Sequence, residues 1–419
     1  MTSDSNAAPA PGPGPSPEHH LPLSGRRIAL GITGSIAAYK AADLCSKLRQ
    51  AGADVEVIMT PAATEFITPL TFKSLTGRDV VVDMFAASEA EAHVEVARRA
   101  DALVIAPATA NCLASLAHGQ APDMVTLTAL ATAAPVLVAP AMDNQMWEHP
   151  ATRANVAILR ERGVDFVGPT EGRLATGRMG PGRLAEPPDI VAHLRALLGQ
   201  RDGDLVGRHV VVSAGPTQEP VDPVRFVGNR STGKMGFAIA EAARDRGAEV
   251  TLVAGPVSLP HQPGICRIDV TTVAEMLAAL ETATSKSDAI IMAAAPADFR
   301  PASAADQKIK KEASDQSLQI ELVRNPDIIA TLPGGGVRVG FAAETHNIER
   351  YAVEKLAAKR LDFIVANDVT AEGSGFGTET NQVIIFHGDG RKEVFPLLSK
   401  YEVGHLILDR VLAHLHAAN

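Results

Sequence analysis

The sequence predicts two α/β domains, each built on an open, mostly parallel sheet with helices on both faces. The chain of 419 residues is longer than one hydrophobic core usually organises. A pattern of strand, glycine-containing loop, helix and strand occurs twice, beginning at Arg27 and again at His209. Short β-branched runs that alternate with helical patterns are typical of parallel sheets covered by helices.

In the first copy, a strand at 27–31 leads through a glycine-containing loop into a helix near 37–50 and then a strand at 54–59. Further short apolar runs predict strands at 102–106 and 135–139. The carboxyl ends of such strands meet at one edge of the sheet, where ligands bind. The pattern therefore predicts a flavodoxin-like, doubly wound sheet with one crevice.

In the second copy, a strand at 209–213 precedes a helix near 236–246 and a strand at 249–253. This arrangement predicts a second, Rossmann-like α/β domain with its own crevice. Further strands are predicted at 289–293, 338–341 and 363–366, followed by a hairpin of 382–386 with 391–395 around the turn-forming residues 387–390.

The composition of the N-terminal segment and of a short polar stretch in the middle predicts where the two domains begin and end. The first 24 residues are rich in Pro, Ala, Gly and Ser, which predicts a disordered leader, and they lack the basic start and apolar run of a signal peptide. A short polar stretch at 200–206 predicts a linker between domains at 25–199 and 207–419. No run of about 18 apolar residues occurs, so no membrane partner is expected.

Composition excludes several classes of function. The net charge of -9 argues against an electrostatic nucleic-acid binder, which needs a basic face. The three cysteines are scattered and have no metal-ligand spacing, which argues against a structural zinc site or a disulfide framework. Small-molecule substrates and a reducing, cytoplasmic location are the expectation.

The loop after the first strand, Gly31 to Ile36, opens a helix whose N–H groups favour a phosphate. Its spacing is not GxGxxG, and the second strand ends in Thr60 rather than an acidic residue, so a mononucleotide such as FMN fits better than NAD. A helix start without a ligand remains the alternative. The candidate FMN-binding residues are Gly34, Ser35, Ile36 and Thr60, with Thr109 and Asn111 from the small-residue loop after the third strand.

These segments, the run Pro-Ala-Met-Asp-Asn-Gln-Met-Trp at 140–147 and the glycine-rich 180–184 together resemble the phosphopantothenoylcysteine decarboxylase family of flavoproteins. The resemblance implies a flavodoxin-like trimer with FMN between subunits, and it implies that 180–184 belong to a substrate flap. It also implies that His93 is the catalytic base, although a histidine considered alone is more often a surface or capping residue. Met142, Asp143 and Asn144 correspond to substrate-binding positions.

The resemblance also implies the decarboxylase chemistry. The flavin oxidises the cysteine thiol of the substrate to a thioaldehyde, whose C=S group accepts the electrons left when CO2 departs. The same flavin then reduces the enethiolate. Without that electron sink the carbanion would be prohibitively basic.

Two residues depart from the family pattern. Asp143 stands where the family carries an asparagine that orients the substrate carboxylate, and two carboxylates repel unless one is protonated. Either Asn144 substitutes after a small shift, or Asp143 is protonated or turned away. Thr176 occupies the position of the flap cysteine and is kept as a candidate catalytic residue, but its hydroxyl is a far weaker acid than a thiol. Another donor, such as water, would then protonate the enethiolate.

The second crevice carries the densest motif. Residues 228–234 formally read G-x-x-x-x-G-K, but Met235 replaces the Ser or Thr of a P-loop, and a proline-containing segment separates the motif from its strand. The remaining functional interpretation is an anion-binding turn at a helix start, with Ser231 and Lys234 facing phosphate. A plain capped helix start is the alternative, and the lysines at 308–311 are solvated in most such runs.

The span 207–419 resembles phosphopantothenate–cysteine ligase, whose bacterial members use CTP. The resemblance implies that an acyl-cytidylate forms with loss of pyrophosphate and that the amine of cysteine then displaces CMP. Magnesium would bridge the phosphates, and Asn229 would act on the acyl intermediate as an oxyanion-hole donor would. The implied nucleotide-binding residues are Ser231, Lys234, Asp298, Lys308, Asp327, Phe341, Lys355 and Lys359, with Lys308 also counted as catalytic.

Together the two halves resemble the bifunctional decarboxylase and ligase family of coenzyme A biosynthesis. Trimeric decarboxylase contacts and dimeric ligase contacts would close a homo-oligomer, which could be a dodecamer. Three alternatives remain open: a flavin oxidoreductase fused to a P-loop kinase, a flavin-binding interaction module in the first half, and a weak decarboxylase beside an active ligase.

Overall fold

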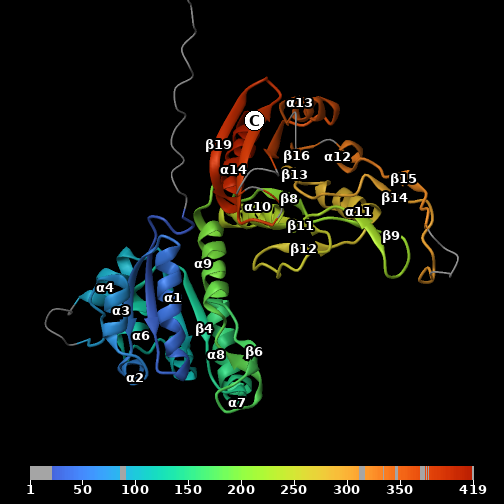
Figure 1. Cartoon of the computed structure of the whole chain (residues 1–419). Coiled ribbons are helices and arrows are strands. Elements are labelled where there is room, and N and C mark those ends of the chain that lie inside the picture. The colour runs from blue at the N-terminus through green and yellow to red at the C-terminus, as the bar shows by residue number, and fades with distance from the viewer. Residues whose placement is uncertain are drawn as a thin grey trace, which may run out of the picture.

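Figure 1 shows the computed structural model, which describes residues 21–84, 91–310, 317–333, 335–344, 348–368, 373, 375 and 377–417. Two α/β lobes follow one another along the chain, and each contains a largely parallel sheet. The prediction of two successive α/β folds is therefore confirmed. No helix in this described part of the chain is both long and apolar enough to cross a membrane.

The first sheet has, in the described residues, five parallel strands in the order β2-β1-β3-β4-β5. This is the doubly wound order of flavodoxin-like folds, and it places the topological switch point between β1 and β3. The loops after these two strands therefore diverge and leave a crevice at their carboxyl ends. The strands are β1 (Arg27–Ile32), β2 (Asp54–Met59), β3 (Ala102–Ala108), β4 (Val136–Pro140) and β5 (Asp165–Phe166).

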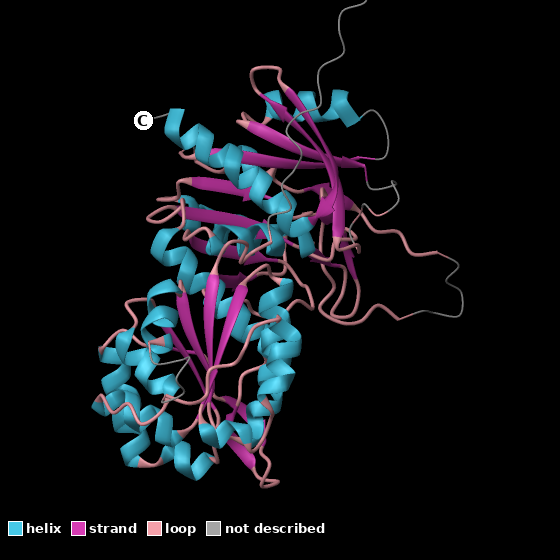
Figure 2. Cartoon of the chain, turned by 90° about the vertical axis from the view of Figure 1, so that its left-hand side faces the viewer, coloured by secondary structure: helices cyan, strands magenta, loops and turns pink. Residues whose placement is uncertain are grey.

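Helices cover both faces of the first sheet (Figure 2). Alternate strand residues point to opposite faces, so Leu30 packs in a core with α1 and α9, whereas Ala29 packs in a core with α4, α5, α6 and α8. An antiparallel hairpin of β6 and β7 projects from the lobe. The elements are η1 (Ile36–Ala38), α1 (Tyr39–Gln50), α2 (Pro61–Thr64), α3 (Pro69–Thr76), α4 (Ala92–Arg99), α5 (Ala110–His118), α6 (Met124–Ala131), α7 (Asn144–Glu148), α8 (Pro150–Glu161), β6 (Thr170–Arg173), β7 (Met179–Arg183) and α9 (Pro187–Asp202).

The second sheet has eight strands among the described residues, in the order β12-β11-β8-β13-β16-β17-β18-β19. The first six of these strands are parallel to one another, and the closing hairpin β18–β19 is antiparallel, as its turn residues predict. The switch point lies between β8 and β13. The strands are β8 (His209–Ala214), β11 (Glu249–Ala254), β12 (Cys266–Asp269), β13 (Ala289–Met292), β16 (Val337–Glu344), β17 (Phe363–Asp368), β18 (Thr380–His387) and β19 (Lys392–Ser399).

One face of the second sheet packs on α10 and α14, and the other packs on α11, α12 and α13. Two short antiparallel ribbons, β9 with β10 and β14 with β15, lie outside the main sheet, at the end of this lobe far from the first one (Figure 1). The elements are β9 (Gln218–Pro220), β10 (Phe226–Gly228), α10 (Lys234–Asp245), α11 (Val273–Thr284), β14 (Phe299–Pro301), β15 (Leu322–Arg324), α12 (Ile328–Thr331), α13 (Ile348–Ala358) and α14 (Lys400–Ala417).

The predicted leader and linker both need correction at their edges. Residues 1–20 of the leader lie outside the described residues, but the prediction of disorder is wrong for 21–24. Leu23 is buried in the first core, and its N–H donates to the carbonyl of Ala51 over 2.8 Å. In the predicted linker, residues 200–202 complete α9, and Leu205 is buried in the second core. At both places a single buried leucine, Leu23 or Leu205, orders a segment whose composition is otherwise polar or rich in small residues.

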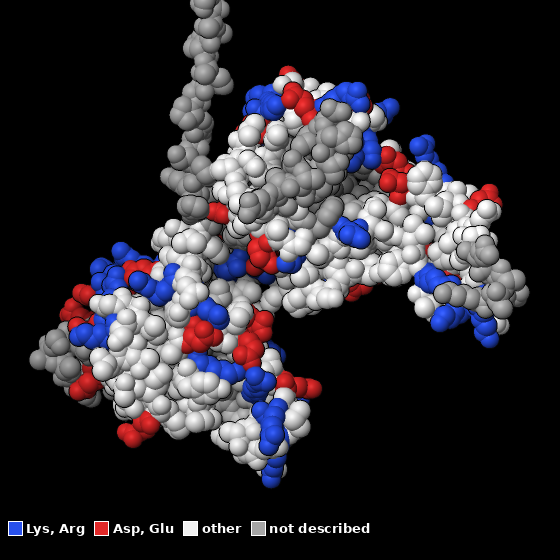
Figure 3. Space-filling view, in the orientation of Figure 1, with Lys and Arg blue, Asp and Glu red and all other residues white. Residues whose placement is uncertain are grey.

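Charges are mixed over the surface. On the face shown in Figure 3, Lys and Arg side chains alternate with Asp and Glu over both lobes and form no continuous basic field among the described residues. This distribution agrees with the net negative charge of the sequence.

Candidate active sites

The first cavity lies where the loops after β1, β3 and β4 meet the β6–β7 hairpin, and its volume is about 600 Å³. Its position is the switch-point crevice that the strand order predicts. The residues that line it are Gly34, Ser35, Ile36, Ala37, Tyr39, Lys40, Thr109, Ala110, Ala141, Met142, Asp143, Met146, Arg173, Leu174, Ala175, Thr176, Gly182, Arg183 and Leu184.

Local hydrogen bonds hold the loops after β1 and β3 together at this cavity. The Thr33 hydroxyl donates to the carbonyl of Pro107 over 2.7 Å and accepts from the N–H of Thr109 over 3.1 Å. The Ser35 and Thr109 hydroxyls cap η1 and α5 respectively. Two helix starts therefore face one cavity, which is the arrangement that favours an anionic group.

The structure brings four of the six predicted FMN-binding residues to this cavity. Gly34, Ser35, Ile36 and Thr109 line it, but Thr60 and Asn111 do not. Thr60 is buried, and its hydroxyl accepts from the N–H of Ala63 as the cap of α2. Asn111 is exposed in the first turn of α5. Sequence position alone does not give the direction in which either side chain points.

The two residues that depart from the family pattern contact each other. Thr176 lies between β6 and β7, and its hydroxyl is 3.2 Å from Asp143 Oδ2. Asp143 Oδ1 accepts from the N–H of Gln145 over 3.0 Å as the cap of α7. Met142 also lines the cavity, whereas Asn144 does not, and its Oδ1 is buried without a hydrogen-bond partner in the described residues. Asp143, rather than Asn144, therefore faces the cavity.

His93 lies in the first turn of α4, is half-buried and does not line the cavity. Lys40, which no sequence motif singled out as a site residue, does line it. The Lys40 ammonium is 3.0 Å from Glu186 Oε1, and this hydrogen bond holds the pKa of Glu186 below its ordinary value. Lys40 lies one helical turn beyond the glycine loop, and this spacing could have identified it as a candidate site residue from the sequence.

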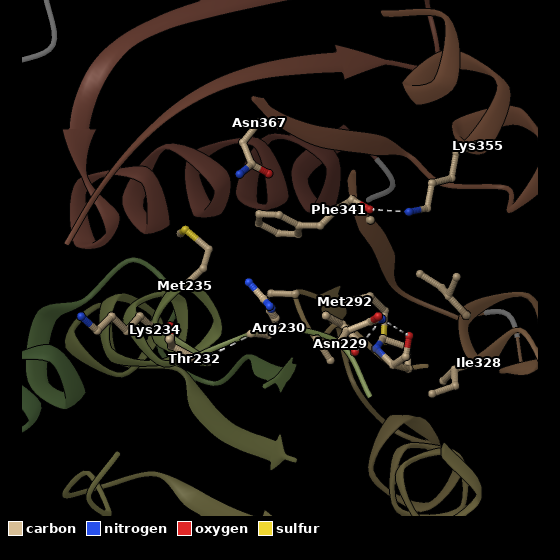
Figure 4. Close-up of a pocket in the computed structure, with 18 of the residues that line it drawn as sticks. Asn229, Arg230, Thr232, Lys234, Met235, Met292, Ile328, Phe341, Lys355 and Asn367 are labelled. Carbon is tan, nitrogen blue, oxygen red and sulfur yellow. Dashed lines mark hydrogen bonds between the residues drawn. The ribbon is translucent and has the colours of Figure 1, made fainter. Parts of the chain in front are cut away.

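The second cavity has a volume of about 420 Å³ and lies at the carboxyl ends of β13, β16 and β17, beside the start of α10. Figure 4 shows its walls, with Lys355 and Lys234 at opposite ends of the view. The residues that line it are Asn229, Arg230, Ser231, Thr232, Gly233, Lys234, Met235, Met292, Ala293, Ala294, Ala295, Pro296, Asp298, Asp327, Ile328, Ile329, Gly340, Phe341, Lys355, Lys359, Leu361, Asn367, Gly375, Asn381 and Lys400.

This cavity gathers the predicted ligase residues from separate segments of the chain. Lys308 is the exception, because it is exposed and does not line the cavity. Its neighbour Ile309 is held by Asp222, whose Oδ2 accepts from the N–H of Ile309 over 3.2 Å. The predicted residues that do line the cavity are Asn229, Ser231, Lys234, Asp298, Asp327, Phe341, Lys355 and Lys359.

The lysines of this cavity are held in place by oxygen acceptors. Lys355 donates to the carbonyl of Phe341 over 2.7 Å (Figure 4), and Lys359 is 2.8 Å from Asp327 Oδ2. Lys234 is 2.5 Å from Glu379 Oε1. Ordered ammonium groups from different elements around one cavity suit an elongated, multiply charged anion.

Asn229 joins the two loops at the mouth of the second cavity. Its side-chain amide donates to the carbonyls of Pro296 over 2.9 Å and of Ala295 over 3.3 Å (Figure 4). The amide nitrogen is therefore already engaged by acceptors in this structure. Donation to a tetrahedral intermediate requires one of these bonds to open.

Lys400 is a residue of this cavity that no sequence motif pointed to. It is 4 % exposed, and its ammonium donates to the carbonyls of Gly375 and Thr378. In the described part of the chain, no group of three or more His, Cys, Asp and Glu side chains is arranged to hold a metal ion.

The fold and the two cavities define a two-lobed α/β protein with a flavodoxin-type crevice and a lysine-lined crevice. The Flavoprotein family model matches residues 16–199, and the model of the DNA/pantothenate metabolism flavoprotein C-terminal domain matches residues 205–415. The chain is 47% identical over 398 residues to the coenzyme A biosynthesis bifunctional protein CoaBC of Bacillus subtilis (strain 168), covering 93% of this chain and 98% of the relative. It is 45% identical over 410 residues to that of Escherichia coli (strain K12), covering 95% and 100%. The chain belongs to the family of coenzyme A biosynthesis bifunctional proteins.

Solved structures match each half. The C-terminal domain of a coenzyme A biosynthesis bifunctional protein CoaBC is 38% identical, with a TM-score of 0.44, and the match covers 51% of this chain and 98% of that one. A mutant PPC decarboxylase complexed with pantothenoylaminoethenethiol is 32% identical, with a TM-score of 0.37, and the match covers 41% and 96%.

Proposed function

We propose that this chain catalyses two consecutive steps of coenzyme A biosynthesis. The second half condenses 4′-phosphopantothenate with L-cysteine using CTP, and the first half decarboxylates the product with FMN. The observation that carries the proposal is the convergence of eight predicted residues, from Asn229 to Lys359, on one 420 Å³ cavity. Membership of the family supports both activities.

In the ligase half, CTP would occupy the lysine-lined cavity. A carboxylate oxygen of phosphopantothenate attacks the α-phosphorus, and the bond to pyrophosphate breaks. The amine of cysteine then attacks the acyl carbon, CMP leaves and an amide forms. Lys234, Lys355 and Lys359 neutralise the phosphates, with Mg²⁺ bound mainly through the phosphates themselves. Activation is required because carboxylate oxygen is a poor leaving group, whereas CMP leaves readily.

Lys308 would join this site from outside the cavity. It is exposed, and the Asp222 carboxylate holds its neighbour Ile309 beside the β9–β10 ribbon. A movement of this segment, or a neighbouring subunit, would therefore bring Lys308 to the nucleotide. Lys308 remains a proposed catalytic residue on the family resemblance alone.

In the decarboxylase half, the residues present fit FMN. The Gly34–Ile36 loop and Thr109 supply capped helix starts for a phosphate, and Met142 and Met146 supply apolar wall for a flat ring. When bound, FMN supplies the two-electron redox chemistry that makes loss of CO2 feasible. Asp143 and Thr176 bring the hairpin onto the cavity, and His93 is the proposed base.

The position of the proposed base, His93, favours an oligomer. His93 does not line the cavity of its own chain, whereas Ile36 and Tyr39 are exposed at the mouth. A neighbouring subunit that covers this mouth would supply His93 and bury these side chains. Phe226 and Phe299 are likewise exposed on the ribbons of the second lobe, which suits a second subunit contact. Sedimentation of the full chain tests this: a monomer contradicts it.

A second candidate function is an active ligase beside a first half that binds flavin and decarboxylates weakly or not at all. The threonine at position 176 favours it, because the hydroxyl of Thr176 is a far weaker acid than the cysteine of the family pattern. Yellow protein that condenses the substrates without releasing CO2 is the outcome this candidate requires.

The deciding experiment supplies phosphopantothenate, cysteine, Mg²⁺ and each nucleoside triphosphate in turn. Pyrophosphate, CMP and CO2 are followed separately. The proposal requires CTP-dependent release of equimolar pyrophosphate and CMP, followed by CO2. Release of a nucleoside diphosphate would instead indicate a kinase and would reject the ligase mechanism.

A further inference from the structure

Two helices of the second lobe begin with a lysine at the same cavity. Lys234 is the first residue of α10, and Lys400 is the first residue of α14. Both side chains line the 420 Å³ cavity. A helix start carries a partial positive charge, so a lysine in the first turn is the least favourable charge for that position. Two such lysines at one cavity need an electrostatic explanation.

Burial makes the charge on Lys400 more costly. The side chain is 4 % exposed, and its partners are neutral carbonyls of Gly375, at 2.9 Å, and of Thr378, at 2.5 Å. Both of these hydrogen bonds go to backbone carbonyls rather than to a carboxylate. Desolvation, and then repulsion by Lys234, lower the pKa of Lys400, while Glu379 opposes the shift.

The acidic groups nearby only partly compensate. Glu379 pairs with Lys234 at 2.5 Å and is exposed. Glu402 accepts from the N–H and the hydroxyl of Ser399, so it caps the start of α14. The start of α10 has Gly233 as its cap residue and no side-chain cap hydrogen bond. The part of the cavity around Lys234 and Lys400 thus combines two ammonium groups with two helix starts, and among the described residues only the exposed Glu379 carboxylate pairs directly with either lysine.

We propose that Lys400 and Lys234 form a phosphate-binding subsite of the second cavity. In the structure, the Lys400 ammonium donates to the carbonyls of Gly375 and Thr378. The Lys234 ammonium donates to the carbonyl of Gly377 and to the Glu379 carboxylate. A bound phosphate provides stronger, charged acceptors for the same donors. The inference rests on the proposed function only for the source of the phosphate, which is either the triphosphate of the nucleotide or the 4′-phosphate of phosphopantothenate.

The first test needs no substrate. Inorganic tripolyphosphate is added to the full-length FMN-loaded protein, and thermal stabilisation is measured for wild type, Lys400→Met and Lys392→Met. Lys392 is a matched control because it lies in the same lobe but pairs with Glu349 at the surface. Tripolyphosphate is expected to stabilise the wild type and the control and to lose about 10- to 100-fold in affinity for Lys400→Met. Absence of stabilisation in the wild type overturns the proposal without any variant.

The second test separates the two sources of phosphate. Pyrophosphate release is measured while CTP, phosphopantothenate and phosphate-free pantothenate are varied in turn. A rise in the KM for CTP in Lys400→Met assigns the subsite to the triphosphate. A rise in the KM for phosphopantothenate, with a reduced preference over pantothenate, assigns it to the 4′-phosphate. If neither KM changes in a folded variant, Lys400 does not bind phosphate.

Lys400 also holds Gly375 and Thr378, so two further variants distinguish a loss of phosphate binding from misfolding. Lys400→Gln keeps an N–H donor for the loop carbonyls but removes the charge, and Lys400→Arg keeps the charge. The proposal requires the glutamine variant to behave like the methionine variant and the arginine variant to stay within a few-fold of wild type. Tripolyphosphate binding that depends on Lys400 in a protein that releases no pyrophosphate from CTP would retain the subsite and reject the proposed function.

Discussion

At the scale of single residues, the first cavity depends on a pair that differs from the family pattern. Asp143 and Thr176 each look unfavourable alone, since one brings a negative charge to a carboxylate substrate and the other is a poor acid. The structure places the Thr176 hydroxyl 3.2 Å from the Asp143 carboxylate. The hydroxyl thus acts as a donor that holds the β6–β7 hairpin against the start of α7. We interpret the two changes as coupled.

Substitution of the pair tests this coupling. Thr176→Val and Asp143→Ala should each raise the KM for phosphopantothenoylcysteine, because each removes the contact that holds the hairpin down. The double variant should be no worse than either single one, with a coupling energy of about 1 kcal/mol. Thr176→Ser keeps the hydroxyl and serves as the control. Strictly additive effects on CO2 release would show that the contact has no role.

His93 is a second residue-scale prediction. His93→Asn should keep the yellow colour of bound FMN but reduce CO2 release by roughly 100-fold or more, the usual loss when a catalytic base is removed. Pyrophosphate release by the ligase half should not change. His118→Asn, at the exposed end of α5, is the matched control. Unchanged CO2 release in the His93 variant would support the flavin-binding alternative for the first half.

At the scale of elements, one buried carboxylate organises the segment that carries Lys308. Asp222 accepts from the backbone N–H groups of Val224, Arg225 and Ile309 and from the Arg225 guanidinium. The bonds join the loop before β10 to the segment after β14. Because Lys308 is next to Ile309, we expect Asp222 to act as a positioning residue for it.

Asp222→Asn tests that role. The amide cannot accept as many hydrogen bonds, so the 305–309 segment should loosen and the KM for CTP should rise about tenfold, with flavin content unchanged. Asp306→Asn, at an exposed position of the same segment, is the control. An unchanged KM for CTP would separate Lys308 from nucleotide binding.

The same carboxylate predicts a dependence of stability on pH. Burial alone would raise the pKa of Asp222, but the three N–H donors outweigh it and hold the pKa below its ordinary value. A carboxyl with a depressed folded pKa stabilises the protein above its unfolded pKa, and this contribution is lost as the pH falls through the lower folded value. The melting-temperature difference between wild type and Asp222→Asn should therefore stay constant down to about pH 4 and shrink only below it.

At the scale of the whole molecule, α9 of the first lobe packs on α10 of the second (Figure 1), and the Arg195 guanidinium of α9 lies 4.7 Å from the centre of the Tyr401 ring of α14. Asp245 is the centre of this contact: it pairs with Arg195 and Arg244 and accepts from the Tyr401 hydroxyl over 2.8 Å. Both arginines and the aspartate are largely buried. The same burial raises the pKa of Tyr401 above its ordinary value. The lobes are thus joined by a buried charged network rather than by a free linker.

Asp245→Ala should destabilise this junction by about 3 kcal/mol, because it removes the more buried of the two carboxylates that pair with both guanidinium groups and leaves only Glu241. Calorimetry of the full chain checks this, since the two lobes need not unfold together. Asp409→Ala removes a more exposed partner of Arg246 and should cost about 1 kcal/mol or less. Equal effects of the two variants would contradict a buried junction.

Much of the fold follows from local patterns. The β-branched strands, the glycine loops at Gly31 and Gly233 and the hairpin turn at 387–390 predict elements that the structure contains. The short strands β5, β6, β7, β9, β10, β12, β14 and β15 were missed, because segments of two to five residues carry no clear alternation. Burial of Leu23 was missed because the composition of the leader masked one apolar anchor.

Hydrophobic periodicity and glycine loops act over a few neighbouring residues, so they were enough to predict the main parallel strands and the two crevices at the carboxyl ends of those strands. Most of the candidate residues for the two cavities came from the family resemblance. Which side chains meet depended on the packed molecule. Packing turned Thr60 and Asn111 away from the first cavity, paired Asp143 with Thr176, left Lys308 outside the second cavity and brought Lys400 into it. Such contacts join elements that are distant in sequence, and local patterns do not carry that information.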